Sequence, residues 1–312
     1  MKHQLCCPLP VALALVLTSA ATACIYEDDD CPEELSITIQ ADWTETPEAT
    51  PEGMAYIFFP TDGSEPWRFD FPGREGGKVS ILTGDYRVLS FNDDTYHVLF
   101  RGTDNYDSYE AYTNETSPQL KNERTVESPD MMWGCAYSGF NLTYCGVWYA
   151  SPENKDMFSP EFVFTARQRA ITPRYTYTIL NVKNLSGVKS MSATLSGMAG
   201  SMFLASKRCG DYPSTLSVKA SARDSTSVEG QFHTFGIPQS PSASNILSLF
   251  AVLKDGRRFC YEFDVTDQIR KSPDPMNVSI LLDGLSLERP EGGAGFEVNV
   301  DGWQTIIVNI NG

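Results

Sequence analysis

The sequence predicts an all-β protein built from two tandem antiparallel Greek-key β-sandwiches. Apolar and polar residues alternate with a period of two through much of the 312-residue chain, which is typical of strands that are buried on one face. Turn residues such as Asp-Gly and Gly-Gly recur at intervals of roughly ten residues, the spacing of strands in antiparallel sandwiches. No long amphipathic helical pattern interrupts them, so folds that alternate strands and helices are disfavoured.

The alternation predicts individual strands along the chain. It is clearest at residues 35–43 and 175–179, where Leu, Ile and Tyr alternate with Ser and Thr. Further strands are expected at residues 86–91, 161–165, 296–300 and 306–310. Turns are expected at Asp62-Gly63, Gly73, Gly76-Gly77, Gly84-Asp85, Asn92-Asp93-Asp94, Asp255-Gly256, Asp283-Gly284 and Asp301-Gly302.

Residues 1–23 have the pattern of a secretory signal peptide. Basic residues precede an apolar run at residues 11–17, and small residues follow at 19–23. The run is well short of the ~20 apolar residues that a membrane-spanning helix needs. We therefore predict that residues 1–23 are removed and are not part of the fold.

The rest of the chain is too long for one ordinary sandwich and about right for two. The polar stretch at residues 151–156 is the expected boundary, because it follows an aromatic-rich region and precedes a predicted strand. We therefore predict an N-terminal sandwich at residues 35–157 and a C-terminal sandwich at residues 158–312. The polar stretch at residues 238–244 is expected to be a loop inside the second sandwich.

The charge of the chain excludes some classes of partner. Its 40 acidic and 24 basic residues give a formal net charge of −16. Such a charge argues against binding to nucleic acid and against direct adhesion to anionic lipid surfaces.

The end of the signal peptide resembles the lipobox of bacterial lipoproteins. The residues are Ala21-Thr22-Ala23-Cys24, although the family usually has Leu where Ala21 stands. The resemblance implies that Cys24 receives a diacylglycerol and becomes the first residue of the mature protein. Two or more acyl chains anchor a protein stably to a bilayer. The alternatives are simple cleavage, with Cys24 paired to Cys31, or a metal site, for which neither a His nor a second Cys pair lies nearby at zinc spacing.

Four consecutive acidic residues follow the predicted lipidation site. Glu27, Asp28, Asp29 and Asp30 resemble the export signal of Bacteroidota lipoproteins that are displayed on the outer face of the outer membrane. Their charge also suits a solvated spacer, predicted at residues 24–34, that holds a folded domain away from the bilayer. The resemblance predicts a lipid-anchored outer-membrane protein facing the cell exterior, with the periplasmic face as the alternative.

Longer stretches resemble the fimbrillin-like lipoproteins of Bacteroidales. The residues that carry this resemblance are Pro51–Pro60, Asp62-Gly63, Gly76–Val79, Gly84–Tyr86, Phe91–Thr95 and Gly295–Trp303. The resemblance implies two transthyretin-like sandwiches, as in the subunits and cell-surface anchors of type V pili. It also implies fimbrial partners that associate by β-strand addition to an open sheet edge. No basic residue occurs between Cys24 and Arg68, so proteolytic processing of a stalk subunit is not expected there and an anchor or accessory role is favoured.

Catalytic chemistry has little support in the sequence. Outside the signal peptide the histidines are His97 and His233, both in strand-like stretches, where histidine is usually structural. The chain has no G-x-S-x-G, H-E-x-x-H or phosphate-loop motif. The acidic stretch at residues 104–110 lacks the glycine and the spacing of a calcium loop. We expect no catalytic residue, metal or cofactor, with carboxylate-pair glycoside hydrolysis as the weakest alternative.

The segment at residues 133–149 holds six aromatic residues and two cysteines. Trp133, Tyr137, Trp148 and Tyr149 are candidates for stacking against sugar rings, which would make the chain a glycan-binding lipoprotein. The competing interpretation places these aromatics in the seam between the two sandwiches. Cys135, Cys145, Cys209 and Cys260 are candidate disulfide partners, with Cys31 unassigned, and the spacing does not decide the pairing.

Overall fold

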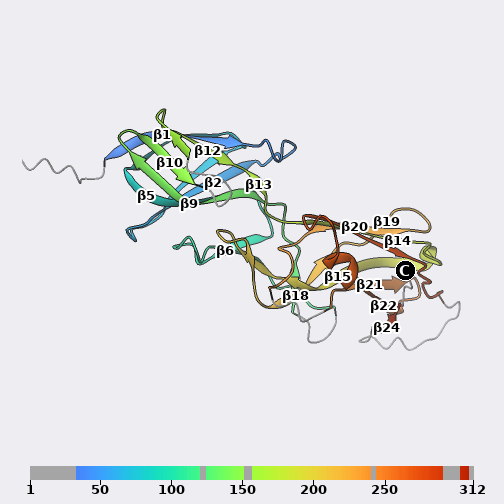
Figure 1. Ribbon diagram of the computed structural model, residues 1–312. Coiled ribbons are helices and arrows are strands. Elements are labelled where there is room, and N and C mark those ends of the chain that lie inside the picture. The colour runs from blue at the N-terminus through green and yellow to red at the C-terminus, as the bar shows by residue number, and fades with distance from the viewer. Residues whose placement is uncertain (1–32, 120–123, 151–156, 240–243, 291–302, 309–312) are drawn as a thin grey trace, which may run out of the picture. The chain divides into compact units, whose positions relative to one another are not determined.

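The computed structural model describes residues 33–119, 124–150, 157–239, 244–290 and 303–308 (Figure 1). Strands make up most of these residues. Within these ranges there are one α-helix, α1 (Thr266–Arg270), and one 3-10 helix, η1 (Leu185–Gly187). The prediction of an all-β sandwich protein is confirmed.

Two sheets face each other across the first apolar core. The smaller sheet contains β12 (Val163–Arg167), β1 (Glu34–Asp42) and β4 (Gly76–Leu82), in this order. The larger contains, in order, β11 (Met157–Ser159), β10 (Gly146–Ala150), β9 (Trp133–Thr143), β5 (Gly84–Asn92), β2 (Gly53–Pro60) and β3 (Trp67–Pro72), and β13 (Arg169–Ala170) pairs with β9. Alternate residues of β1, such as Ile37 and Ile39, point into this core, which accounts for the period of two.

Two further sheets enclose a second core in the C-terminal half. One contains β19 (Ser221–Ala222), β20 (Val228–His233), β14 (Arg174–Leu180) and β23 (Asn277–Asp283), in this order. The other contains β24 (Gln304–Ile307), β22 (Arg258–Asp264), β21 (Ile246–Leu253), β15 (Val188–Ala199), β18 (Pro213–Val218) and β8 (Thr125–Glu127). Val278, Ile280 and Leu282 of β23 all point into this core.

A small sheet combines strands from both halves of the chain. It contains β17 (Arg208–Cys209), β16 (Ser201–Phe203), β7 (Glu110–Thr113) and β6 (Val98–Arg101), in this order. Side chains from this sheet share a third core with Ala55, Ile57 and Phe59 of β2. The other face of β2 lies in the first core. The strand β2 is therefore buried on both faces, which explains its nearly continuous apolar sequence.

The strand pairing does not divide the chain at residues 157 and 158, where the sequence predicted the domain boundary. The strand β12 follows that point but pairs with β1 in parallel, and β8 precedes it but pairs with β18. In the described part of the chain, β14 with β23 and β22 with β24 are also parallel pairs. The polarity of a stretch does not determine which strands pair on either side of it. Residues from Glu34 onward group as one compact unit.

Most of the predicted strands are present, and so are the predicted turns at Asp62-Gly63, Gly73 and Asp255-Gly256. The predicted turn residues Gly76-Gly77 and Gly84-Asp85 lie at the starts of β4 and β5, and Asp301-Gly302 lies outside the described residues. The predicted strands at residues 35–43, 86–91, 161–165 and 175–179 correspond to β1, β5, β12 and β14, and every end is shifted by one or two residues. The strand predicted at 306–310 overlaps β24, and the one at 296–300 lies outside the described residues. Six of the predicted turn glycines have the positive φ that favours glycine: Gly63 (86°), Gly73 (71°), Gly76 (82°), Gly84 (149°), Gly256 (93°) and Gly284 (86°).

Candidate functional site

The predicted lipidation and export residues lie outside the described residues. These are Cys24, Glu27, Asp28, Asp29 and Asp30, and Cys31 and the signal peptide lie there too. The first strand, β1, begins at Glu34, so the last residue of the predicted spacer is already part of a sheet. Within the described ranges, no helix has the length and apolar character to cross a membrane.

The four candidate disulfide cysteines are not disulfide-bonded in the described part of the chain. Cys135 and Cys145 lie near opposite ends of the β9–β10 hairpin. At about 3.3 Å per residue along β9, their Cα atoms lie well beyond the ~7 Å limit for a disulfide. Cys209 and Cys260 lie on β17 and β22, which belong to different sheets. The distance along β9 therefore excludes the pair Cys135 and Cys145, and Cys209 and Cys260 are not bonded to each other either.

Cys135 is a partly buried structural thiol. Its Sγ lies 3.2 Å from Ser90 Oγ and 3.7 Å from Gln168 Nε2. Burial raises the pKa of the Cys135 thiol to about 12, and the reactive form of a cysteine is the thiolate. Cys209 donates to the carbonyl of Phe235 at 3.0 Å, and burial raises its pKa as well. Neither thiol is poised for redox or nucleophilic chemistry.

Two of the four candidate glycan-stacking residues belong to the first core. Tyr137 and Tyr149 are 3% and 5% exposed and meet at a ring separation of 5.8 Å. Trp133 is partly buried against the same core. Tyr137 and Tyr149 fill the interior of the first sandwich. They are therefore neither exposed to stack against sugar rings nor placed in a seam between the two sandwiches.

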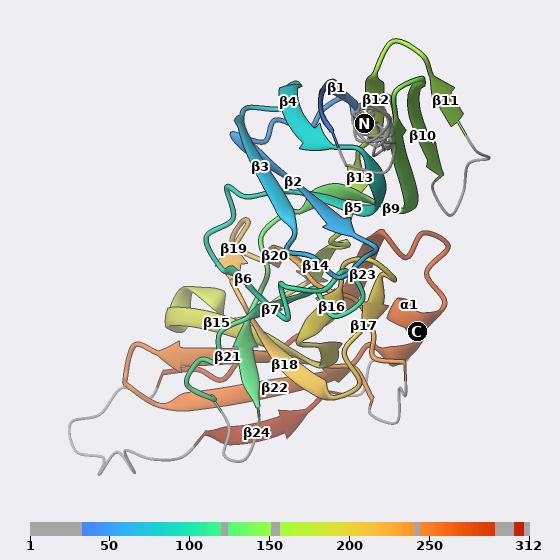
Figure 2. The ribbon, with the colours of Figure 1, turned by 90° about the vertical axis from the view of Figure 1, so that its left-hand side faces the viewer.

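The remaining glycan-stacking candidate, Trp148, is part of an exposed aromatic pair. Trp148 on β10 is 46% exposed and Phe158 on β11 is 42% exposed. They are cross-strand partners, and their rings lie 4.4 Å apart with an interplanar angle of 31°. Met157 beside Phe158 is also exposed. Figure 2 shows β11 as the outer strand next to β10, so this aromatic pair lies at a sheet edge.

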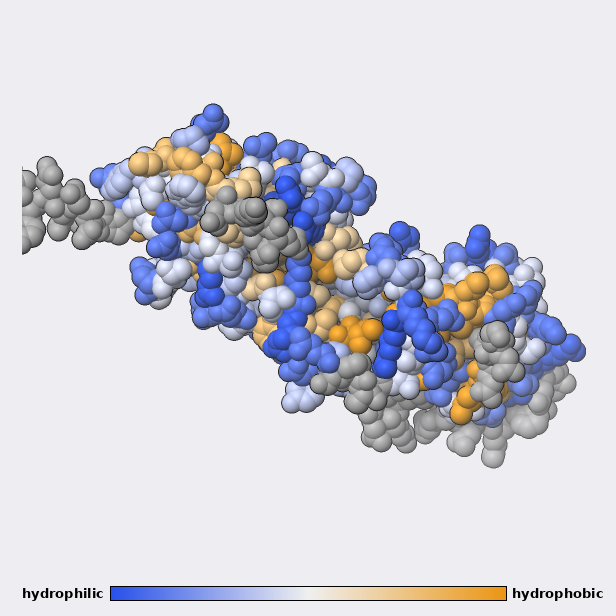
Figure 3. All heavy atoms as spheres, in the orientation of Figure 1, coloured by the Kyte–Doolittle hydropathy of each residue, from blue (hydrophilic) through white to orange (hydrophobic). Residues whose placement is uncertain are grey.

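Phe158 and Met157 were missed by sequence reasoning because β11 has only three residues. Such a short strand shows no recognisable alternation. An available signal was the return of apolar residues directly after the polar stretch at 151–156. Elsewhere, hydrophilic residues cover much of the face seen in Figure 3, with hydrophobic residues between them.

The histidines have structural surroundings. His97 precedes β6, and its Nδ1 lies 3.0 Å from Asp130 Oδ1. The same carboxylate accepts the backbone N–H groups of Tyr96 and His97, at 2.7 and 2.5 Å. Burial would raise the pKa of Asp130, but these hydrogen bonds lower it overall. His233 ends β20, and burial lowers its pKa.

The acidic stretch at residues 104–110 supplies ion pairs. Asp107 lies 2.6 Å from Arg87 and Glu110 lies 2.6 Å from Arg101. No group of three or more potential metal ligands occurs within the described ranges. The carboxylates of Asp107 and Glu110 are thus engaged by arginines.

The outer edge of β23 is closed by a side chain of α1. Gln268 donates from Nε2 to the carbonyl of Leu281 at 3.0 Å, and its Oε1 accepts the Leu281 N–H at 2.8 Å. The amide group of Gln268 therefore occupies the place of a neighbouring strand. Covering an edge in this way hinders pairing with other chains.

The edge formed by β24 is weakly held. It runs parallel to β22 over four residue pairs and is the outer strand of its sheet (Figure 1). Ile306 packs against the second core, whereas Ile307 is 73% exposed. Just before β24, the Trp303 ring lies 4.8 Å from that of Phe250. One short strand neighbour and a few side chains hold this segment.

This arrangement of sandwiches is shared with solved all-β structures from Bacteroides that are described as adhesins. One candidate adhesin from Bacteroides ovatus ATCC 8483 has a TM-score of 0.63 at 20% identity, over 85% of this chain and 96% of that one. A second from Bacteroides ovatus has a TM-score of 0.50 at 9% identity, over 81% and 87%. These likenesses establish the shared fold.

The chain belongs to the DUF5119 family, described as a domain of unknown function, whose model matches residues 24–219. It is also 23% identical over 329 residues to a candidate fimbrium anchoring subunit, Fim4B, of Bacteroides ovatus. That match covers 93% of this chain and 94% of Fim4B. None of these descriptions names an enzymatic activity. The matches confirm the resemblance to the fimbrillin-like proteins of Bacteroidales that the sequence motifs predicted.

Proposed function

We propose that this chain is a lipid-anchored cell-surface protein that anchors a fimbrium, or assists its assembly or adhesion, through β-strand addition. The observation that carries the proposal is the similarity to the fimbrium anchoring subunit candidate Fim4B along 93% of the chain. Similarity along the whole length supports a similar role better than a match to one domain would. The role is structural and non-enzymatic, and its partners are other fimbrial subunits.

The geometry of the sheet edges supports strand addition at β22. Adding a strand to an open edge gives affinity through main-chain hydrogen bonds and specificity through alternate side chains. The edge of β23 is closed by Gln268, whereas β22 is covered by the four-residue strand β24. A partner strand that replaced β24 would gain the backbone positions from Phe259 to Glu262.

Attachment to the outer membrane rests on the sequence motif at Cys24. A diacylglycerol on this residue would hold the mature chain at the membrane without a membrane-spanning helix. The acidic residues Glu27–Asp30 behind it support display on the outer face. The net charge of −16 keeps the folded part from lying on an anionic surface.

Deletion of the gene tests the fimbrial role. We expect cells without the protein to lose attached fimbriae or to release them into the medium, and to adhere less, as seen by electron microscopy and adhesion counts. Reintroducing the complete chain should restore both, whereas a Glu262→Pro chain, which loses a backbone donor on the β22 edge that β24 covers, should restore neither. A Tyr212→Ala chain, altered at an exposed side chain away from β24, is the matched control and should restore both. Unchanged fimbriae and unchanged adhesion after deletion of the gene would refute the proposal.

A glycan-binding surface protein is the second candidate function. The observation that favours it is the exposed Trp148–Phe158 pair, because exposed aromatic faces stack on sugar rings. This version of the hypothesis retains Trp148, adds Phe158, and omits Tyr137 and Tyr149, which are buried.

Affinity electrophoresis against a panel of polysaccharides tests glycan binding. We expect a retarded band that a Trp148→Ala, Phe158→Ala double variant loses, because both stacking surfaces are removed. The Tyr212→Ala variant, which removes another exposed ring, should migrate as the unaltered protein does. Equal mobility of all three proteins on every glycan would leave the fimbrial role as the proposed function.

A further inference from the structure

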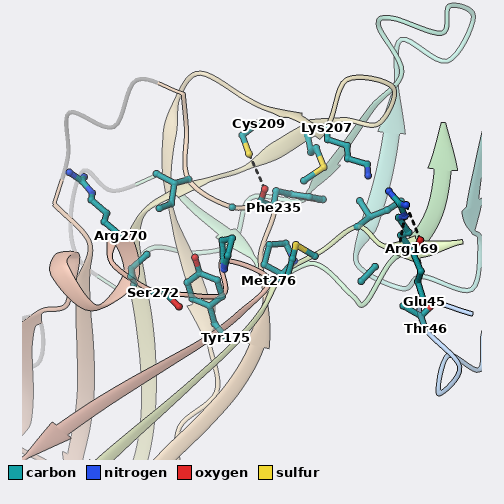
Figure 4. Close-up of a pocket in the computed structure, with 18 residues that line it drawn as sticks. Glu45, Thr46, Arg169, Tyr175, Lys207, Cys209, Phe235, Arg270, Ser272 and Met276 are labelled. Atoms are coloured by element: carbon teal, nitrogen blue, oxygen red, sulfur yellow. Dashed lines mark hydrogen bonds and ion pairs between the residues drawn. The ribbon is translucent and has the colours of Figure 1, made fainter. Parts of the chain in front are cut away.

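A pocket of about 640 Å³ lies outside the edges described above (Figure 4). Side chains from residues 45–46, 169–175, 202–209, 235–237 and 269–276 line it. Ligand pockets for small molecules typically measure about 300–1,000 Å³. The pocket is therefore of a size to hold a small molecule.

The middle of the pocket is apolar. Phe235 and Ile269 are buried side chains that form part of its wall, together with Tyr175 and Met276. Tyr175 belongs to β14, which pairs with β20 on one side and β23 on the other. The wall at β14 thus offers no free strand edge to an extended peptide, and an apolar small molecule suits it better.

The two ends of the pocket carry positive charge. Figure 4 shows Arg270 at one end and Lys207 with Arg169 at the other, with Phe235, Tyr175 and Met276 between them. The guanidinium of Arg169 is neutralised by Glu45, at 2.7 and 2.8 Å. A cluster of cations around an apolar wall stands out in a chain whose net charge is −16.

Lys207 is an exposed turn lysine at one end of the pocket, and the nearby acid Glu45 is paired with Arg169. In the described part of the chain its ammonium group makes no hydrogen bond and no ion pair. Desolvation and the neighbouring Arg169 guanidinium lower its pKa. Its backbone has a φ of 54°, and residues other than glycine are uncommon in this left-handed region. An anion beside Lys207 would give its ammonium group a direct partner, which the Glu45 carboxylate, paired with Arg169, does not supply.

We propose that this pocket binds an amphiphilic anion, with its apolar chain against Phe235 and Met276 and its carboxylate or phosphate group beside Lys207. Apolar side chains with a few well-placed polar groups are the usual lining of such sites. The anionic group would accept a hydrogen bond from the Lys207 ammonium group, and such charge-assisted bonds are stronger than neutral ones. This inference does not depend on the fimbrial role.

Isothermal titration calorimetry of the purified protein tests the proposal. The probes are sodium decanoate and decyl phosphate, each below its micelle-forming concentration. We expect saturable binding of at least one with a stoichiometry near one, and the probe that binds more tightly identifies the head group. Decyltrimethylammonium, which has the same chain and the opposite charge, should bind much more weakly.

Two variants and a control connect binding to the pocket. Lys207→Gln should weaken binding by about tenfold, the loss of one charge-assisted hydrogen bond. Met276→Asp should abolish it by placing a carboxylate in the apolar middle. Lys254→Gln, at another exposed turn lysine, should bind as the unaltered protein does. Circular dichroism and thermal unfolding establish that each variant is folded.

Several results would overturn the proposal. One is the absence of saturable heat with both anionic probes. Another is binding of decyltrimethylammonium that is as tight as binding of the anionic probes. A third is that Lys207→Gln and Lys254→Gln change the binding of the anionic probes to the same extent. Binding of a synthetic peptide of alternating valine and aspartate, with no binding of decanoate or decyl phosphate, would assign the pocket to a polypeptide instead.

Discussion

Replacing Phe164 by alanine is expected to lower the free energy of unfolding by roughly 3–5 kcal/mol, the usual cost of removing a buried phenyl group. Phe164 on β12 is fully buried in the first core. Its ring packs at 5.0–6.1 Å against four others, those of Phe58, Tyr137, Phe140 and Tyr149. Urea unfolding followed by circular dichroism measures the change.

This prediction also tests the observed pairing of β12. Phe164 follows the boundary predicted from the sequence, but it completes the core of the sandwich that precedes it. The control is Phe158→Ala, which removes an exposed ring in the same stretch of chain and should cost less than about 1 kcal/mol. If Phe164→Ala lowered the free energy of unfolding by as little as the control Phe158→Ala, β12 would not pack against β1 as described.

Replacing Cys24 by alanine is expected to move nearly all of the protein from the membrane fraction to the soluble fraction. The acyl chains that this thiol would carry contribute about 0.8 kcal/mol per buried methylene group, and the described residues contain no helix that could replace them. Cell fractionation with immunoblotting measures the distribution, and incorporation of labelled palmitate measures acylation.

Cys31→Ala is the matched control, because it removes a cysteine seven residues further along the chain. We expect this variant to remain in the membrane fraction and to incorporate label. Retention of the Cys24→Ala protein at the membrane would refute lipid anchoring through this residue. Release of both variants would point to a pairing of the two thiols.

These strands could be predicted because burial on one face produces an alternation of apolar and polar residues within a short stretch of sequence. In β1 and β14 every second side chain faces a core, so the alternation is visible in five to nine residues. The turns were equally local, since a positive φ at residues such as Gly63 requires glycine or a close substitute. The strand β11 has three residues and two exposed side chains. It shows no alternation of apolar and polar residues and was therefore missed.

The candidate site was harder to predict, because residue type does not reveal which face of a strand meets solvent. Tyr149 and Trp148 are neighbours on β10 and both are aromatic, yet one is buried and the other exposed. A side chain of β10 is buried only if it lies on the face of the strand against which the second sheet packs. Cys135 is a similar case, since its position on β9 away from the turn at Cys145 excludes the pairing that their spacing left open.

The sequence by itself determined the all-β class, several of the strands and turns, and the resemblance to fimbrillin-like surface proteins. Each of these depends on short stretches of neighbouring residues. The tertiary structure alone decided that β12 pairs with β1, that β7 pairs with β16, and that the cations Arg169 and Lys207 meet at one end of a pocket. These contacts join residues 38 to 125 positions apart, and they depend on how whole sheets pack, which no local pattern encodes.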